Sequence, residues 1–201
     1  MAGRKRSSPM IGDLFEATPA GPEGFAYQPE LFSESQERDL ASRFPSLPFQ
    51  PFEFHGHLGN RRIVSFGWRY DYGGRALRPA PAMPEFLQGL KEIVAGFSFI
   101  PDAEFRQVLV TEYAPSAGIG WHRDKPMFDS VVAFSFLAPC LLRFRQRQGD
   151  SWQRRSIAIA PRSGYLLRGA ARAEWEHSIP PLDRLRYSVT FRNFRPDVIL
   201  P

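Results

Sequence analysis

The sequence predicts an α+β protein, an antiparallel sandwich or jelly roll with helices packed on one side. Helical patterns occur in the first half of the 201 residues, and short strand-like runs fill the second half. Because no helical pattern lies between these runs, successive strands must return directly to one another, which favours antiparallel pairing.

Two helices are expected before residue 100. Ser33 followed by Gln36 is a capping-box pattern, and it opens a short helix that ends near Phe44. Pro84 is typical of a helix start, and the apolar residues after it keep helical spacing until Gly96. Both helices therefore belong to the N-terminal half.

Six strand-like runs follow residue 100, with Pro, Gly and Asp between them. They are "RQVLVTEYA" (106–114), "SVVAFSFLA" (130–138), "LLRFRQR" (141–147), "SIAIA" (156–160), "GYLLRG" (164–169) and "RYSVTFRNF" (186–194). In the third run Leu142 and Phe144 alternate with three arginines, which predicts a strand with one side in solvent.

The length suits one domain with a substantial core. Residues 1–30 are rich in Pro, Gly and Ser and are expected to form a partly disordered N-terminal arm, with residues 31–201 as the single domain. The lone Cys140 excludes an internal disulfide and a thiolate zinc cage. No apolar segment follows the basic start, and none reaches the roughly 20 residues of a membrane span. We therefore expect a cytoplasmic monomer.

The charge balance suits a polyanionic partner without proving one. The net charge is +5 and the pI is about 9.7, and Lys and Arg that neutralise phosphates supply most non-specific affinity for nucleic acid. Of the 26 basic residues, 23 are Arg, a bias that genome composition explains equally well.

The stretch "WHRDKP" (121–126) fits two kinds of site. His-Arg-Asp begins the catalytic loop of a protein kinase, but the fifth residue after Asp124 is Asp129 rather than Asn, and the glycine-rich loop and D-F-G are absent from the sequence. As an extended His-x-Asp pair, His122 and Asp124 point to one side. With His177 from a later strand they form the two-histidine, one-carboxylate set of non-haem Fe(II) oxygenases.

A second pattern supports the oxygenase. In "RYSVTFR" Arg186 and Arg192 are six residues apart, so they share one face of a strand with Ser188 and Thr190. A guanidinium group at such a place can bind a carboxylate through two hydrogen bonds. The order of His-x-Asp, distal His and Arg-x5-Arg, with "TEYAPSAGIGWHRD" upstream, resembles the AlkB family of Fe(II)/2-oxoglutarate-dependent dioxygenases from about Phe52 to Phe194.

The resemblance implies a double-stranded β-helix and a role for each matching residue. The iron ligands would be His122, Asp124 and His177. The residues that bind 2-oxoglutarate would be Arg186, Tyr113, Ser188 and Thr111, of which Ser188 and Thr111 replace the asparagines usual in the family. Arg192 would lie beside Asp124 and the substrate. Arg192 and Asp124 are the expected catalytic residues. O₂ would be the second cosubstrate.

The segment "RRIVSFGWRYDYGG" (61–74) corresponds to the family's nucleotide-recognition lid, expected over about residues 52–76. Alternation along one strand would place its four aromatic residues on one side, where a base taken out of its stack needs an aromatic slot. The expected substrate-binding residues are Trp68, Tyr70, Tyr72, Arg61 and Arg62. An aromatic-rich core strand is the alternative for Phe66 and Trp68.

The resemblance implies oxidative dealkylation of N-alkylated bases in DNA, as in the repair of alkylation damage. The same chemistry on RNA such as tRNA, or on a protein, is an alternative, and so is a binding module that has lost its iron. Family members that repair bases often carry an acid just after His-x-Asp, whereas this chain has Lys125 and Pro126. We therefore expect broad selectivity, with 1-methyladenine and 3-methylcytosine favoured because their positive charge suits Asp124.

Overall fold

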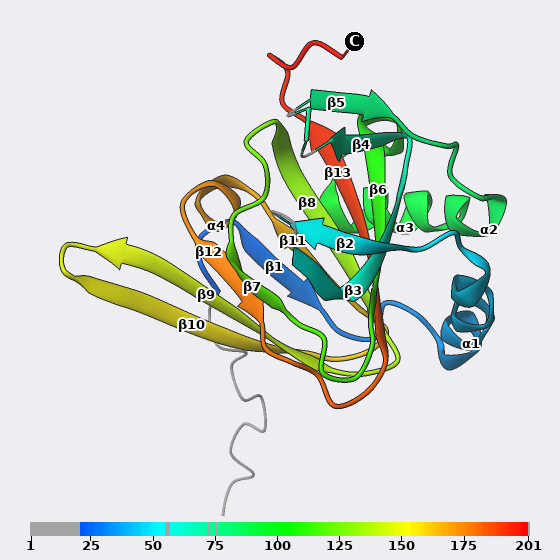
Figure 1. The fold of residues 1–201 in the computed structure, drawn as a ribbon, viewed down its shortest axis with the longest axis horizontal. Helices are drawn as coiled ribbons and strands as arrows, with labels where there is room; N and C mark the ends of the chain where they lie inside the picture. Colours follow the sequence, from blue (N-terminus) through cyan, green and yellow to red (C-terminus); the bar gives the residue numbers. More distant parts are fainter. Residues whose placement is uncertain (1–20, 55–56, 72, 75, 201) are drawn as a thin grey trace, which may run out of the picture.

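The computed structural model describes residues 21–54, 57–71, 73–74 and 76–200 (Figure 1). The strands are β1 (Phe25–Gln28), β2 (Gln50–Phe54), β3 (His57–Phe66), β4 (Trp68–Asp71), β5 (Ala76–Pro79), β6 (Phe105–Tyr113), β7 (Ile119–His122), β8 (Phe128–Phe136), β9 (Cys140–Gln148), β10 (Ser151–Ile159), β11 (Ser163–Leu167), β12 (Glu176–Ile179) and β13 (Arg186–Phe194). The helices are α1 (Glu34–Arg43), α2 (Glu85–Gln88), α3 (Leu90–Ser98) and α4 (Gly169–Ala173), with 3₁₀ turns η1 (Phe44–Ser46) and η2 (Asp102–Glu104).

Two antiparallel sheets pack face to face. The major sheet has the strand order β1-β11-β8-β13-β6-β3-β2, and the minor sheet has the order β10-β9-β12-β7. Apolar residues from both sheets form one core cluster, in which Val131 and Leu167 of the major sheet join Leu142 and Phe144 of the minor sheet. The β9–β10 hairpin extends away from the body of the molecule (Figure 1). The predicted antiparallel α+β jelly roll is confirmed.

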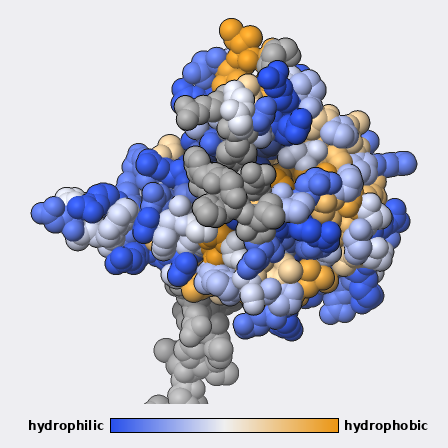
Figure 2. Space-filling model, in the orientation of Figure 1, coloured by the Kyte–Doolittle hydropathy of each residue, from blue (hydrophilic) through white to orange (hydrophobic). Residues whose placement is uncertain are grey.

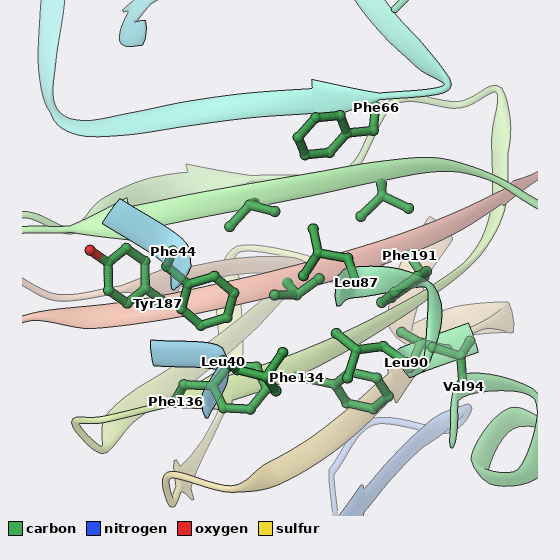
Figure 3. Close-up of a cluster of buried hydrophobic side chains, with 14 of the residues drawn as sticks. Leu40, Phe44, Phe66, Leu87, Leu90, Val94, Phe134, Phe136, Tyr187 and Phe191 are labelled. Carbon is green, nitrogen blue, oxygen red and sulfur yellow. The ribbon is translucent and has the colours of Figure 1, made fainter. Parts of the chain in front are cut away.

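The other face of the major sheet is covered by the helices from the N-terminal half. Leu40 of α1, Leu87 of α2 and Val94 of α3 are buried in one cluster with Phe134 and Phe191 from the sheet (Figure 3). Helices on one side and the minor sheet on the other leave the major sheet buried on both faces. Its central strands are therefore rigid supports for side chains that point between the sheets.

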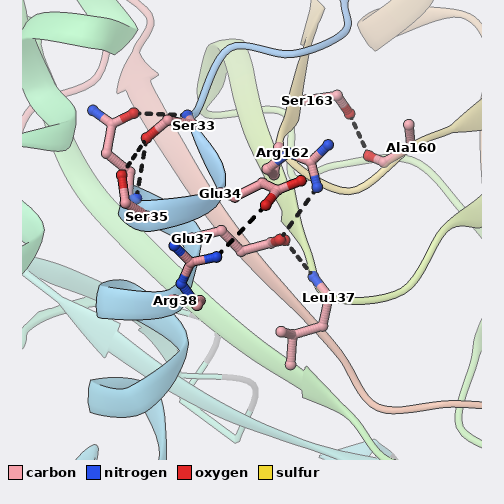
Figure 4. Close-up of polar contacts among 10 residues, drawn as sticks. Ser33, Glu34, Ser35, Glu37, Arg38, Leu137, Ala160, Arg162 and Ser163 are labelled. Carbon is pink, nitrogen blue, oxygen red and sulfur yellow. Dashed lines mark hydrogen bonds and ion pairs between the residues drawn. The ribbon is translucent and has the colours of Figure 1, made fainter.

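Helix α1 begins as the sequence predicts. The Ser33 hydroxyl accepts a hydrogen bond from the backbone of Gln36, whose side chain in turn accepts one from the backbone of Ser33, so the capping box is complete (Figure 4). Glu37 ties the helix to the sheet, because its carboxylate accepts a hydrogen bond from the Leu137 backbone and lies 3.6 Å from Arg162.

Glycines divide two elements that the sequence predicted as continuous. The strand expected across residues 61–74 is broken at Gly67, which has a φ of +73° and an ideal Cβ position only 2.2 Å from the Arg106 carbonyl oxygen. The helix expected over residues 84–96 is two helices, α2 and α3, because Gly89 ends one and begins the next.

The N-terminal boundary also differs from the prediction. Residues 25–28, expected in the arm, form strand β1 and pair with β11 at the edge of the major sheet. The folded domain therefore begins before residue 31. Residues 1–20 lie outside the described part of the chain. None of the helices that the structure describes has the length and apolar character that a transmembrane helix needs.

Candidate active site

A cavity of about 720 Å³ lies between the two sheets and is lined by residues from both. Strand β13 crosses one wall, and the period of two along a strand decides which of its side chains line the cavity. Ser188, Thr190 and Arg192 face the cavity. Tyr187 and Phe191 point the other way, into the core beneath the helices.

The three predicted iron ligands come together on the wall formed by β7 and β12. These strands pair antiparallel with His122 opposite His177, and the centroids of the two imidazole rings are 4.3 Å apart. Asp124 follows two residues after His122, and its Oδ2 atom lies 3.6 Å from Nε2 of His177. Pairing across the sheet thus joins residues that are far apart in the sequence.

The protonation of the group suits a divalent cation. Burial lowers the pKa of His122 and lowers that of His177 to about 4, so both imidazoles are neutral near pH 7. Burial alone would raise the pKa of Asp124, but Arg192 and the two histidines lower it to about 2. Nδ1 of His122 donates a hydrogen bond to the Gly120 carbonyl at 2.9 Å, which leaves the Nε2 lone pair available to a metal.

These residues fit Fe(II) by their donor chemistry. Neutral imidazole and carboxylate are the ligands of facial iron sites, and three protein donors leave positions open for a cosubstrate and oxygen. Among the described residues, no three His, Cys, Asp or Glu side chains already stand in a closed metal-ligand arrangement. The fit therefore rests on the donor set and its protonation.

Arg192 orients the carboxylate of Asp124. Its Nη2 atom donates to Asp124 Oδ1 at 3.1 Å, and its Nη1 atom donates to the side chain of Gln107 at 3.2 Å. Nε of Arg192 is buried and has no hydrogen-bond partner among the described residues. Arg192 thus holds Asp124 and retains one donor within the cavity wall. Gln107 was not predicted from the sequence, because it belongs to no motif and only the β6–β13 pairing brings it next to Arg192.

Arg186 forms a cationic site beneath the cavity. Its side chain is fully buried, and Nε donates to the Ser135 hydroxyl at 3.0 Å. The other two guanidinium nitrogens, Nη1 and Nη2, are buried without a hydrogen-bond partner among the described residues. A buried cation with unsatisfied donors is costly, and a bidentate carboxylate would satisfy both nitrogens. The site therefore fits the distal carboxylate of 2-oxoglutarate.

The other predicted cosubstrate residues surround this guanidinium. Register pairs Arg186 with Tyr113 and Ser188 with Thr111, so all four side chains lie between the sheets. The Arg186 guanidinium carbon is 5.1 Å from the centroid of the Tyr113 ring. Tyr165 on β11 also lines the cavity, and burial raises the pKa of its hydroxyl, which is therefore a neutral hydrogen-bonding group. Sequence reasoning missed Tyr165 and Ser135 because neither belongs to a motif.

The predicted substrate residues separate into two groups. Arg61 and Tyr70 line the cavity. Arg62 lies on the opposite face of β3, where its guanidinium makes two hydrogen bonds to Glu112, at 2.7 and 2.9 Å. Adjacent residues of a strand face opposite ways, so the structure does not bring Arg62 to the cavity with Arg61.

Trp68 does not line the main cavity either. The turn at Gly67 redirects the chain, and the Trp68 ring packs edge-on against Phe194, with the two centroids 6.4 Å apart. The alternation expected from Phe66 to Tyr72 therefore fails at Gly67, and Phe66 is a core residue. Tyr72 lies outside the described residues.

The metal-free protein should lose stability as the pH falls below about 6.5. The folded-state pKa of His177 is about 4, below its ordinary value of 6.5, so the unfolded chain binds a proton more readily. Between these values each pH unit should lower the free energy of unfolding by about 1.4 kcal/mol, and the lowered pKa of His122 acts in the same direction.

Urea unfolding of the metal-free protein at about pH 7.5 and about pH 5 would measure this loss. In the variant His177→Asn the dependence on pH should be shallower, because one of the two responsible groups is gone. Equal stability of the wild-type protein at both pH values would contradict the assignment of neutral imidazoles.

Comparisons with known proteins agree with this geometry. The model of the 2OG-Fe(II) oxygenase superfamily matches residues 28–192. The alkylated DNA repair protein ALKBH8 homolog of Arabidopsis thaliana is 24% identical over 164 residues, which are 69% of this chain and 47% of that protein. An uncharacterised protein of Acanthamoeba polyphaga mimivirus is 30% identical over 148 residues, covering 66% of this chain and 70% of that protein.

The fold has a solved counterpart in the structure of OsALKBH1. The two structures superpose with a TM-score of 0.65 at 16% sequence identity, covering 85% of this chain and 96% of the other. The chain spans about half the length of the Arabidopsis relative. Members of the matched superfamily are oxygenases that use Fe(II), 2-oxoglutarate and O₂, so the predicted cofactors are confirmed. This chain belongs to the 2OG-Fe(II) oxygenase superfamily, and the predicted resemblance to the AlkB family is confirmed.

Proposed function

We propose that this protein is a dioxygenase that removes alkyl groups from the ring nitrogens of nucleobases in DNA. The observation that supports this most strongly is the set of groups gathered at one cavity: a two-histidine, one-carboxylate set and Tyr70 line it, and a buried arginine with two unsatisfied donors lies against Tyr113, another lining residue. No ligand residue is replaced, which favours an enzyme over a module that has lost its iron.

The residues of the chain would divide the work between them. His122, Asp124 and His177 would hold Fe(II), which with 2-oxoglutarate and O₂ supplies the oxidation of a C–H bond. Arg186 would fix the cosubstrate, and Arg192 would keep Asp124 in position. Oxidation of an N-methyl carbon gives an N-hydroxymethyl group, which leaves as formaldehyde and restores the base. 2-Oxoglutarate becomes succinate and CO₂.

A basic and aromatic surface beside the cavity supports nucleic acid as the partner. We call it the Trp–Arg face, and it lies on the outer side of the minor sheet. Its residues are Trp121, Arg143, Arg145, Arg147, Trp152 and Arg154. The Arg145 guanidinium carbon is 4.5 Å from the centroid of the Trp121 ring and 4.4 Å from that of Trp152. Figure 2 shows the projecting hairpin as predominantly hydrophilic.

The position of Trp121 links this face to the active site. Trp121 precedes His122 on β7, the edge strand of the minor sheet, and it also contributes to the lining of the cavity. A strand of nucleic acid that places one base in the cavity could therefore continue across the Trp–Arg face. Arginines that contact phosphates and tryptophans that stack on bases are the usual means of binding single strands. Two of its arginines have acidic neighbours, since Arg145 lies 2.6 Å from Glu176 and Arg147 lies 3.8 Å from Asp150.

Reversing charges on the Trp–Arg face should weaken DNA binding. In the double variant Arg147→Glu/Arg154→Glu, we expect affinity for a single-stranded oligonucleotide to fall at least about tenfold at low salt. The plot of log affinity against log salt should also become shallower, by about 0.7 for each phosphate that the variant no longer neutralises. Fluorescence anisotropy of a labelled oligonucleotide measures both quantities.

Arg38→Glu is a matched control, because Arg38 is a solvent-exposed arginine on α1, beyond the major sheet. It changes the net charge without touching the Trp–Arg face. If Arg38→Glu weakens binding as much as the double variant does, or if binding is insensitive to salt, the proposed surface is wrong. A protein or small-molecule substrate would then be favoured.

The proposed reaction is tested by incubating the iron-loaded protein with oligonucleotides that carry single alkylated bases, in matched DNA and RNA sequences. Nucleoside mass spectrometry then measures the loss of each modified base. We expect loss that depends on 2-oxoglutarate and is faster in DNA. Faster loss in RNA would favour the alternative substrate, and no loss from either polymer would contradict the proposal.

A further inference from the structure

Lys125 lines the main cavity beside Tyr70. It directly follows Asp124, and its ammonium nitrogen lies 4.4 Å from the centroid of the Tyr70 ring. Both residues line the main cavity. Tyr70 and Phe52 are described aromatic residues of the predicted lid that line this cavity, and a base stacked against Tyr70 would lie near the ammonium group.

The backbone of Lys125 is held from two sides. Its carbonyl oxygen accepts hydrogen bonds from Nη2 of Arg172 at 2.7 Å and from the Phe128 backbone at 3.1 Å. Arg172 belongs to α4, and its residue is only 7% exposed. A buried arginine therefore fixes the turn after Asp124, and with it the point from which the Lys125 side chain extends.

The charges around the base position are predominantly positive. Among the described residues that line the cavity, Arg61, Arg123, Lys125 and Arg192 are cationic, and Asp124 is the acid. Asp124 is engaged by Arg192 at 3.1 Å and would also bind the iron. The two charges of Fe(II) and the charge of Arg186 are balanced by Asp124 and the two carboxylates of 2-oxoglutarate. The described side chains that line the rest of the cavity are therefore more often basic than acidic.

We propose that Lys125 determines specificity and selects neutral N-alkylated bases that carry a carbonyl oxygen beside the alkylated nitrogen. This inference rests on the proposed function. It names 1-methylguanine and 3-methylthymine as better substrates than 1-methyladenine and 3-methylcytosine. It reverses the expectation from the sequence, which considered the charge of Asp124 without the cations around it.

The chemistry of the two groups of bases supports this choice. 1-Methylguanine and 3-methylthymine are neutral, and the carbonyl oxygen next to their methylated nitrogen can accept a hydrogen bond from an ammonium group. 1-Methyladenine and 3-methylcytosine are cationic near neutral pH, and both carry an exocyclic amine next to the methylated nitrogen, although 3-methylcytosine also has its C2 carbonyl oxygen on the other side, so the difference in charge separates the two groups. The positive charge of Lys125 would repel these cationic bases, and its N–H donors would face the N–H donors of the amine. Both effects would select against them.

The test is a competition among four DNA oligonucleotides that are identical except for these four bases. For the wild-type protein, we expect the neutral pair to be oxidised at least about tenfold faster than the cationic pair. Lys125→Glu should shift the ratio towards the cationic bases, and Lys125→Met should give an intermediate ratio. Lys91→Glu on α3 is the control with the same change of charge away from the cavity, and its ratio should match the wild type.

A binding measurement separates recognition from catalysis. The same four oligonucleotides, bound to the metal-free protein and followed by fluorescence anisotropy, should show the same order of preference and the same shift in Lys125→Glu. A wild-type preference for the cationic bases, or a ratio unchanged by Lys125→Glu, would overturn the role of Lys125 while leaving the proposed function intact. If none of the four bases is oxidised, the proposed function fails, and this inference fails with it.

Discussion

Replacing His122 with alanine should reduce 2-oxoglutarate turnover to background while the chain stays folded. His122 is one of the three ligands available to the iron, and it sits on the edge strand β7, where loss of a partly exposed imidazole leaves the core intact. Two remaining donors hold a divalent cation weakly. Succinate formation and metal content after dialysis are the measurements, with thermal unfolding as the check on folding.

Asp129→Ala is the matched control for this prediction. Asp129 is an exposed acid five residues after Asp124, at the position that a kinase catalytic loop would use for magnesium. Its replacement should leave metal content and turnover near the wild-type values. Turnover retained in His122→Ala, or lost equally in Asp129→Ala, would show that the metal is bound elsewhere.

Replacing Arg186 with lysine should raise the 2-oxoglutarate concentration needed for half-maximal turnover by about 100-fold or more, since a bidentate charged pair becomes a single contact. The buried guanidinium has two unsatisfied nitrogens, and one ammonium group cannot reproduce their fork. Steady-state kinetics with varied 2-oxoglutarate measures the change.

The neighbouring Arg184→Lys is the control, because Arg184 is exposed two residues earlier in the chain. It should leave the 2-oxoglutarate requirement unchanged. Oligonucleotide affinity should be unaffected in both variants, since neither residue lies on the Trp–Arg face. An unchanged requirement in Arg186→Lys would exclude Arg186 from the cosubstrate site.

The sequence predicted the parts of the site that depend on local spacing. The period of two along a strand predicts that Ser188 and Arg192 share a face, and the structure places both on the cavity wall. The same period explains why Arg62, which follows Arg61, points away from the cavity. A capping box is equally local, and α1 begins where Ser33 predicts.

Features that depend on strand pairing could not be predicted in the same way. Ser135 reaches Arg186, and Gln107 reaches Arg192, only because β8 and β6 are the two neighbours of β13 in the major sheet. Arg172, which holds the turn after Asp124, lies on a five-residue helix without a sequence signal. The turn at Gly67 depends on a close approach to the Arg106 backbone, which one strand's pattern does not encode.

The central claim is that this site couples decarboxylation of 2-oxoglutarate to removal of an alkyl group from a nucleobase. The direct measurement is the stoichiometry of one reaction mixture containing the iron-loaded protein and an oligonucleotide with a single N-methylated base. We expect succinate, formaldehyde and restored base to form in equal amounts. Succinate formed without formaldehyde, with the methylated base unchanged in DNA and in RNA, would contradict the account.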